Sequence, residues 1–144
     1  MFGSEKQKSL MYRYGGPSNW SQSLNSASIG AGLASIKIHQ TNELLILQER
    51  LLANIQLFDS LIETEQQGTR TAIRLIPCGE AEKANIIAAQ LANSGFFTSA
   101  VFFPVVPRGN AAIRVTLRAD MAHETILSFC SRLMSLIEEN KIDL

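Results

Sequence analysis

The sequence has no excess of charge of either sign and no long apolar run. Its 13 basic and 13 acidic residues cancel to a formal net charge of zero. No segment therefore supplies the positive field that attracts nucleic acid or an anionic membrane surface. No run reaches the roughly 18 apolar residues of a membrane-spanning helix, and the opening segment, MFGSEKQKSLMYRYGG, lacks the apolar core of a signal peptide. These absences predict a soluble protein that binds neither nucleic acid nor membrane.

Cysteine and histidine are also scarce. Cys78 and Cys130 lie far apart without metal-ligand spacing, and His39 and His123 have no partner at such a spacing. No glycine-rich loop has the spacing of a nucleotide-binding motif. We therefore expect two reduced thiols in a cytoplasmic protein without a metal site. Both histidines are interpreted as ordinary residues near helix ends.

The chain has enough apolar residues for one core, because 46% of its 144 residues are hydrophobic. Residues 1–13 have no clear period and are expected either to connect to another segment or to lie loosely on a surface. Small residues at close helical spacing predict a helix within residues 14–39 that can pack tightly against a neighbour. Apolar residues at helical intervals predict a long amphipathic helix over residues 41–63, which ends in a polar segment.

A strand and a helix are predicted next. Residues 71–77 are rich in β-forming types, and Cys78-Gly79 is expected to break this strand. Residues 80–94 return to helical spacing, with acidic residues in the first turn, where the helix dipole favours negative charge. Gly95 follows as the expected end of the helix.

The last third predicts two paired strands and a helix. The strands cover residues 96–103 and 113–117, are joined by the loop PVVPRGN, and are expected to be antiparallel. Asp120 is placed to cap a final helix over residues 121–140. Its expected inward residues are Ile126, Phe129, Cys130, Leu133, Met134 and Ile137. The order β, α, β, β, α predicts an α+β fold, a small antiparallel sheet with helices on one face, preceded by the long amphipathic helix.

The strongest functional signal is the segment FTSAVFFPVVPRGNAAIRVTLRADMAHETILSFCSRL. It combines a strand, a Pro-x-x-Pro turn, a glycine, a strand with a central arginine and a capped helix. The residues in this order are Pro104, Val105, Val106, Pro107, Gly109, Ile113, Arg114, Val115 and Thr116. The pattern resembles the C-terminal domain of the pyridoxal-phosphate-dependent α-oxoamine synthases, which have fold type I. The likeness extends over residues 14–137, and the segment YGGPSNWSQSLN is similar to a subgroup that makes α-hydroxyketone-type quorum-sensing autoinducers.

The resemblance implies a role for Arg114, which matches the family arginine that pairs with the carboxylate of the amino-acid substrate. A planar guanidinium offers two parallel donors to the two carboxylate oxygens, and a strand holds it rigidly. Orientation matters because the bond broken at Cα must stand perpendicular to the cofactor ring. The alternation of the strand, taken alone, favours a surface residue or an ion pair with Asp120 or a nearby glutamate. Arg118, on the same strand face, is interpreted as solvated.

The resemblance also places a phosphate contact near residues 15–21. Many family members carry there a serine or threonine that reaches the cofactor phosphate of the neighbouring subunit, whereas this sequence has Gly15 and Gly16. The glycine amides, with the hydroxyl of Ser18 or Ser21, can still hold a phosphate. A tight turn into a helix, without any phosphate, is an equal alternative. Trp20 is interpreted as a packing residue or the wall of a pocket.

The family's cofactor lysine lies in a Ser-Lys segment on the N-terminal side of everything in this chain. The lysines present lack that context: Lys6, Lys8, Lys37, Lys83 and Lys141. The resemblance therefore implies that no residue here is catalytic and that the chain does not hold pyridoxal phosphate covalently. It also implies that residues 1–35 are a remnant of the large cofactor-binding domain and that residues 36–144 form the C-terminal small domain.

The parent enzyme implied by the resemblance is a homodimer that binds pyridoxal phosphate and condenses an amino acid with an acyl-CoA. The sequence leaves two other interpretations open. The first is a stand-alone, non-catalytic α+β module that binds a small carboxylate or has a regulatory role. The second is a pseudoenzyme subunit that pairs with a complete homologue.

Overall fold

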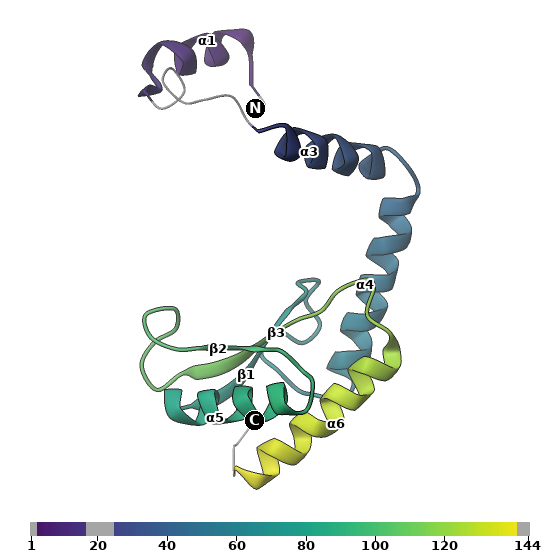
Figure 1. Cartoon of the computed structure of the whole chain (residues 1–144), viewed down its shortest axis with the longest axis vertical. Coiled ribbons are helices and arrows are strands. Elements are labelled where there is room, and N and C mark those ends of the chain that lie inside the picture. The colour runs from purple at the N-terminus through teal and green to yellow at the C-terminus, as the bar shows by residue number, and fades with distance from the viewer. Residues whose placement is uncertain (1–2, 17–24, 141–144) are drawn as a thin grey trace. The chain divides into compact units, whose positions relative to one another are not determined.

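The computed structural model describes residues 3–16 and 25–140, and its contacts divide the chain into two units (Figure 1). The first unit, Met1–Asn42, contains α1 (Glu5–Tyr14) and α3 (Ser26–His39). The elements of the second unit, Glu43–Leu144, are α4 (Glu43–Asp59), β1 (Ile73–Gly79), α5 (Ala81–Asn93), β2 (Ser99–Val101), β3 (Ala111–Thr116) and α6 (His123–Glu139). The assignment of residues 1–35 to a cofactor-binding domain stays a prediction.

The first unit contains a helix that the sequence pattern did not predict. The N–H of Gln7 donates to Ser4 Oγ at 3.3 Å, and the N–H of Ser4 donates to Gln7 Oε1 at 2.8 Å. This reciprocal capping satisfies two amides that a helix start leaves without partners. The expectation of a loose segment over residues 1–13 is therefore wrong, because a local cap starts α1 without any apolar period.

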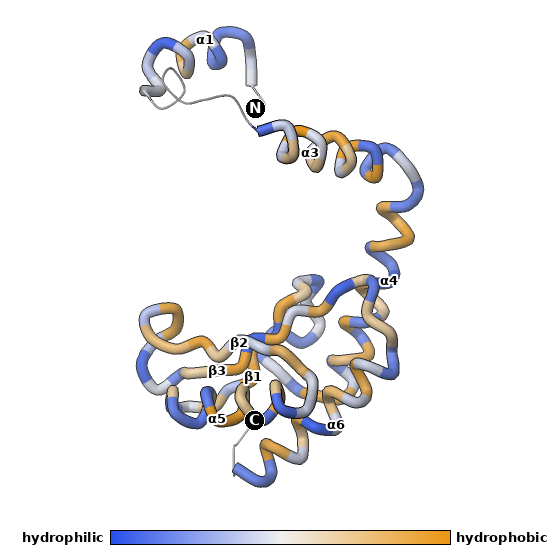
Figure 2. Tube along the Cα trace, in the orientation of Figure 1, coloured by the Kyte–Doolittle hydropathy of each residue, from blue (hydrophilic) through white to orange (hydrophobic). Residues whose placement is uncertain are grey.

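The helix α3 is apolar along much of its length, yet none of its described residues is buried (Figure 2). Its start is fixed by Asn25, whose Oδ1 accepts the N–H of Ser28 at 2.8 Å. The prediction of a helix rich in small residues ending near His39 is confirmed.

The second unit is built on a three-stranded antiparallel sheet in the order β1-β3-β2. Because side chains alternate along a strand, Ala111, Ile113 and Val115 share one face of β3, and all three are buried in the core. The helices α4, α5 and α6 contribute most of the other core residues, so they cover this face. The predicted α+β fold with a small antiparallel sheet and helices on one face is confirmed.

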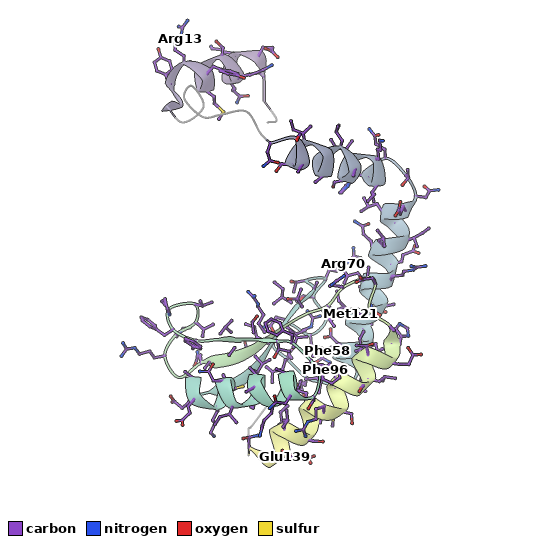
Figure 3. All side chains as sticks on the ribbon, in the orientation of Figure 1. Arg13, Phe58, Arg70, Phe96, Met121 and Glu139 are labelled. Carbon is purple, nitrogen blue, oxygen red and sulfur yellow. The ribbon has the colours of Figure 1, made fainter. Side chains whose placement is uncertain are left out.

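The core between the helices and the sheet is centred on phenylalanine side chains. Phe129 of α6 stacks with Phe58 of α4 at 6.4 Å between ring centroids and meets the edge of Phe96 at 5.4 Å. Figure 3 shows Phe58, Phe96 and Met121 close together beside α4 and α6. Aromatic pairs at such distances add to the burial of apolar surface. This cluster joins α4 to α6, which lie far apart in the sequence.

The helix α4 is also tied to the turn before α6 by a buried amide. Asn54 is 2% exposed, and its Nδ2 donates to the carbonyl oxygens of Arg118 and Met121 at 2.8 and 3.1 Å. Both N–H groups of the amide are thus paired, which offsets the cost of burying it. The C-terminal half of the long helix is therefore fixed against the end of the sheet.

The helix α5 ends as the sequence predicts. Gly95 has a φ of 89°, a left-handed conformation that glycine adopts at little cost. Its N–H donates to the carbonyl of Ala92 at 2.9 Å, and the N–H of Phe96 donates to that of Leu91 at 2.9 Å. This is a Schellman motif, and it directs the chain back toward the sheet.

Two expected strand boundaries are wrong. The strand β1 does not break at Cys78-Gly79 but continues through Gly79, with a register shift between Pro77 and Gly79. Gly79 has a φ of 74°, which accommodates this irregularity. The expected strand over residues 96–103 is only Ser99–Val101 long, because Gly95 turns the chain before it and the next residues turn after it.

Two expectations for the last helix are also wrong. Asp120 does not cap α6, because its carboxylate pairs with Arg118, and the helix begins after Ala122. Met134 is 45% exposed, whereas Leu136 is fully buried beside Ile137. The inward face of α6 is therefore rotated slightly from the predicted one, and the other inward residues are confirmed.

Candidate functional site

Arg114 lies on the face of the sheet that the helices leave uncovered. Its side chain is exposed, whereas those of Ile113 and Val115 on either side of it are buried in the core. In the register of the sheet, Arg114 lies opposite Leu75 of β1 and Ser99 of β2. A central strand, hydrogen-bonded on both sides, therefore holds the backbone of Arg114.

The guanidinium of Arg114 makes no hydrogen bond or ion pair with any other residue in the ranges 3–16 and 25–140. The alternative partner, Asp120, is taken by Arg118, and both of these side chains are exposed. The expectation of an ion pair between Arg114 and Asp120 is therefore wrong. Arg118 is exposed, as expected, although it is paired. Arg114 presents donors that an anion from solution can occupy.

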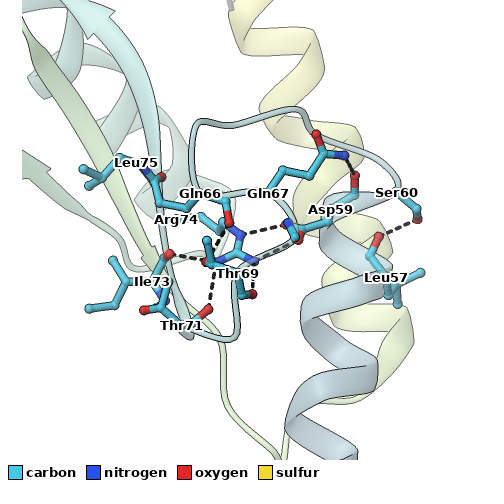
Figure 4. Close-up of polar contacts among 11 residues, drawn as sticks. Leu57, Asp59, Ser60, Gln66, Gln67, Thr69, Thr71, Ile73, Arg74 and Leu75 are labelled. Carbon is cyan, nitrogen blue, oxygen red and sulfur yellow. Dashed lines mark hydrogen bonds and ion pairs between the residues drawn. The ribbon is translucent and has the colours of Figure 1, made fainter.

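Arg74 on the neighbouring strand forms a buried ion pair that the sequence pattern did not predict. Its side chain is fully buried, and its Nε and Nη2 donate to the two carboxylate oxygens of Asp59 at 2.7 and 2.8 Å (Figure 4). The remaining donors reach the carbonyls of Thr69, Thr71 and Ile73. The hydrogen bond from Arg74 lowers the pKa of Asp59, and burial opposes this shift.

A sequence signal for this pair did exist. Arg74, Ile76 and Cys78 alternate along the strand, so the arginine belongs to the face that carries the two apolar residues. A charge on a buried face needs a partner of opposite charge. The identity of the partner, Asp59, depends on the return of the chain after α4, which no local pattern reveals.

Gly15 and Gly16, the glycines expected to hold a phosphate, lie at and just after the end of α1. The N–H of Gly15 donates to the carbonyl of Met11 at 2.8 Å and so ends α1. This amide is used within the helix end, while Gly16 is exposed. The other expected contacts, Ser18, Ser21 and Trp20, lie outside the described residues. A role of Gly15, Gly16 or Ser18 in binding a phosphate stays a prediction.

The cysteines and histidines occupy positions of the expected kind. Cys78 and Cys130 are free and buried, and burial raises the pKa of both thiols, that of Cys130 to about 11. His39 is the last residue of α3 and His123 the first of α6. Among the described residues, no cluster of histidine, cysteine or acidic side chains could hold a metal ion. In the same part of the chain, no helix is long and apolar enough to cross a bilayer.

The lysines of the described ranges lie on helices. Lys6 and Lys8 are on α1, Lys37 is on α3, and Lys83 is exposed in the first turn of α5. Lys83 lines a groove beside the helix-free face of the sheet, together with residues of β1, of β3 and of the loop after α4. The site as a whole offers one free guanidinium on a rigid strand beside this groove. That arrangement can bind and orient an anion, and the role of Arg114 toward a substrate carboxylate stays a prediction.

No family model matches the chain, but individual proteins of known function are similar to it. An 8-amino-7-oxononanoate synthase of Marinomonas sp. (strain MWYL1) is 29% identical over 124 residues, which are 84% of the chain and 31% of that protein. The enzyme of the same name from Petrotoga mobilis is 31% identical over 106 residues, 72% of the chain and 26% of that protein. The chain thus spans less than a third of the length of these curated relatives.

Solved structures show the same fold. A serine palmitoyltransferase from S. paucimobilis matches with a TM-score of 0.81 at 17% identity, over 97% of the chain and 36% of that structure. The 8-amino-7-oxononanoate synthase of Francisella tularensis matches with a TM-score of 0.75 at 18% identity, over 96% of the chain and 41% of that structure. The sequence pattern around Arg114, the named relatives and the shared fold agree. The chain therefore belongs to the pyridoxal-phosphate-dependent α-oxoamine synthases, and it corresponds to their C-terminal part.

Proposed function

We propose that this chain forms the substrate-carboxylate-binding part of a pyridoxal-phosphate-dependent enzyme that condenses an amino acid with an acyl-CoA. The observation that carries the proposal is the position of Arg114, an exposed guanidinium without a partner among the described residues, on a rigid central strand. The complete enzyme is proposed to be a homodimer.

The contribution of Arg114 is recognition and orientation. Two parallel N–H donors fit the two oxygens of a carboxylate, so the amino acid is fixed in angle as well as in position. The backbone of β3 resists displacement because it is hydrogen-bonded to β1 and β2. A fixed carboxylate in turn fixes which bond at Cα stands perpendicular to a bound cofactor ring.

The described residues fit the part of a pyridoxal phosphate site that binds the substrate carboxylate. They do not fit the part that holds the cofactor itself. Arg114 is free for a carboxylate, whereas the N–H of Gly15 is used within a helix end and Lys83 is exposed on α5. When bound, pyridoxal phosphate supplies an electron sink for the carbanion formed at Cα of the amino acid. We assign its covalent attachment to a part of the enzyme outside this chain.

A titration of the purified chain tests the recognition step. Adding an amino acid such as alanine should shift the NMR signals of the Arg114 guanidinium, and alaninamide, which lacks the carboxylate, should not. The Arg114→Gln variant should abolish the carboxylate-dependent shifts. Equal shifts with alanine and alaninamide would contradict the proposed contact.

A chimera tests the activity. The chain would replace the matching part of the Marinomonas relative, and release of free CoA thiol would be followed with alanine and an acyl-CoA. We expect Arg114→Gln to lower kcat/KM for the amino acid by about 10–100-fold, the effect of losing a charge-assisted hydrogen-bonded pair. An unchanged kcat/KM would remove Arg114 from the site.

The finer proposal is that the product is an α-hydroxyketone-type autoinducer. It is supported by the sequence segment YGGPSNWSQSLN, most of which lies outside the described residues. Mass spectrometry of the products of the chimera would test it. A medium-chain aminoketone would agree with a route to an autoinducer, whereas turnover only with a pimeloyl donor would contradict it.

A further inference from the structure

A cavity of about 180 Å³ lies between the end of the sheet and the helices α4 and α6. Phe97, which is 94% exposed, and Thr125, which is also exposed, mark where it opens to solvent. An apolar cavity of about 150 Å³ is large enough to bind benzene. This cavity therefore has room for one substituted ring. Its deep wall consists of core side chains: Phe58, Val115, Leu117, Ile126 and Phe129.

Three phenylalanine rings make this wall suitable for a flat ligand. The ring of Phe129 stacks with that of Phe58 at an interplanar angle of 28°, and it meets Phe96 edge to face at 77°. The wall thus offers both ring faces and ring edges, the two contacts that aromatic pairs prefer. Figure 3 shows Met121 near Phe58 and Phe96, and its thioether can also pack against a ring.

One hydroxyl in the wall lacks a hydrogen-bond partner. The Oγ1 atom of Thr98 is buried, and no residue of the described ranges pairs with it. Thr98 lies two residues before Ala100, which is opposite Ile113 in the sheet, so alternation places it on the core face. A buried hydroxyl without a partner is unfavourable. A ligand in the cavity can satisfy it by accepting the O–H in a carbonyl oxygen.

The cavity favours an uncharged ligand. None of the described residues that line it is charged. An ion in its apolar interior would lack a counter-charge, which is costly. The other polar side chains of the wall, Thr116 and Thr125, are exposed at the surface. A ligand that matches the cavity is therefore neutral and flat, with one hydrogen-bond acceptor directed inward.

We propose that this cavity is a binding site for a small, uncharged aromatic carbonyl compound. The ring of the ligand packs against Phe96, Phe129 and Met121, and its carbonyl oxygen accepts the O–H of Thr98. The site is separate from the proposed carboxylate site. Val115 lines the cavity on the core face of β3, whereas Arg114 is exposed on the opposite face.

The test is an NMR titration of the full chain with two probes of the same shape. Acetophenone has a carbonyl oxygen, and α-methylstyrene has a methylene group in its place. Both should give saturable shifts at Phe96, Met121 and Phe129. If neither probe shifts these signals, the cavity is not a binding site and the proposal is wrong.

The variant Thr98→Val removes the hydroxyl and keeps the shape of the side chain. It should weaken binding of acetophenone by about fivefold or more and should not weaken binding of α-methylstyrene. Unchanged affinity for acetophenone, or an equal loss for both probes, would overturn the hydrogen bond. Thr64→Val is the matched control, because the Oγ1 of Thr64 is also buried without a partner among the described residues but lies outside the cavity. It should change neither affinity.

A charged probe and a second variant separate this site from the one at Arg114. Benzoate has the same ring with a carboxylate, so any shifts it causes should lie near Arg114 and not in the cavity. Benzoate shifts at Phe96 and Phe129 would contradict the preference for a neutral ligand. Arg114→Gln should leave the affinity for acetophenone unchanged, so failure of either site can be recognised independently of the other.

Discussion

Two arginines on neighbouring strands of one sheet have opposite surroundings. Arg74 of β1 is fully buried, and its five N–H donors reach Asp59 and three backbone carbonyls. Arg114 of β3 is exposed on the other face and has no partner among the described residues. A guanidinium with all donors used can only stabilise the fold, whereas one with none used can bind a ligand. The number of paired donors therefore distinguishes a structural arginine from a ligand-binding one, which the residue type alone does not.

The largest expected effect is on the buried pair. Replacing Asp59 by alanine would leave the guanidinium of Arg74 buried without its counter-charge. Loss of one partner of a buried ion pair costs about 3–5 kcal/mol. We therefore expect Asp59→Ala to lower the free energy of unfolding of the chain by this amount, as measured by urea denaturation followed by circular dichroism.

The matched control is Asp120→Ala, because Asp120 also pairs with an arginine but in an exposed position. Exposed pairs contribute about 0–1 kcal/mol. Equal losses in the two variants would mean that burial does not distinguish the two pairs, and the contrast drawn for Arg74 would fail.

A smaller effect is expected from acid. The hydrogen bond from Arg74 lowers the pKa of Asp59 below the ordinary value of 3.8. A carboxyl group whose pKa is lower in the folded state stabilises the protein above its unfolded pKa, and this stability is lost as the pH falls through the folded pKa. The difference in urea midpoint between the wild type and Asp59→Ala should therefore be constant from pH 6 to about pH 4 and should shrink below it. A difference independent of pH down to pH 2.5 would contradict the ionised pair.

Local patterns predicted most of the fold because the elements end at local signals. The helix α5 ends where Gly95 adopts its positive φ, and the pairing of β2 with β3 follows from two β-rich runs joined by a short loop. The errors came where a specific side-chain contact overrides the periodic pattern. Asp120 pairs with Arg118 instead of capping α6, and Ser4 with Gln7 starts a helix without an apolar period.

The candidate site was predictable only in part. The motif around Arg114 indicated an arginine on a strand, and alternation indicated its exposed face. The partner of Arg74 and the unpaired hydroxyl of Thr64 were not predictable, because both lie in or next to the loop that returns from α4 to β1. The conformation of that loop depends on contacts such as Gly68 N–H with Asp59 at 3.1 Å, which no periodicity encodes.

The smallest expected effect on stability sharpens the comparison most. Arg114→Gln removes an exposed side chain without a partner in the described residues, so the free energy of unfolding should change by less than about 0.5 kcal/mol. The same substitution at Arg74 should destabilise the chain strongly, because it leaves the Asp59 carboxylate and three carbonyls without donors. Urea denaturation of the two variants side by side measures both effects. If Arg114→Gln is as destabilising as Arg74→Gln, then Arg114 stabilises the fold. Weaker carboxylate binding by the Arg114→Gln variant could then no longer be attributed to the removed N–H donors.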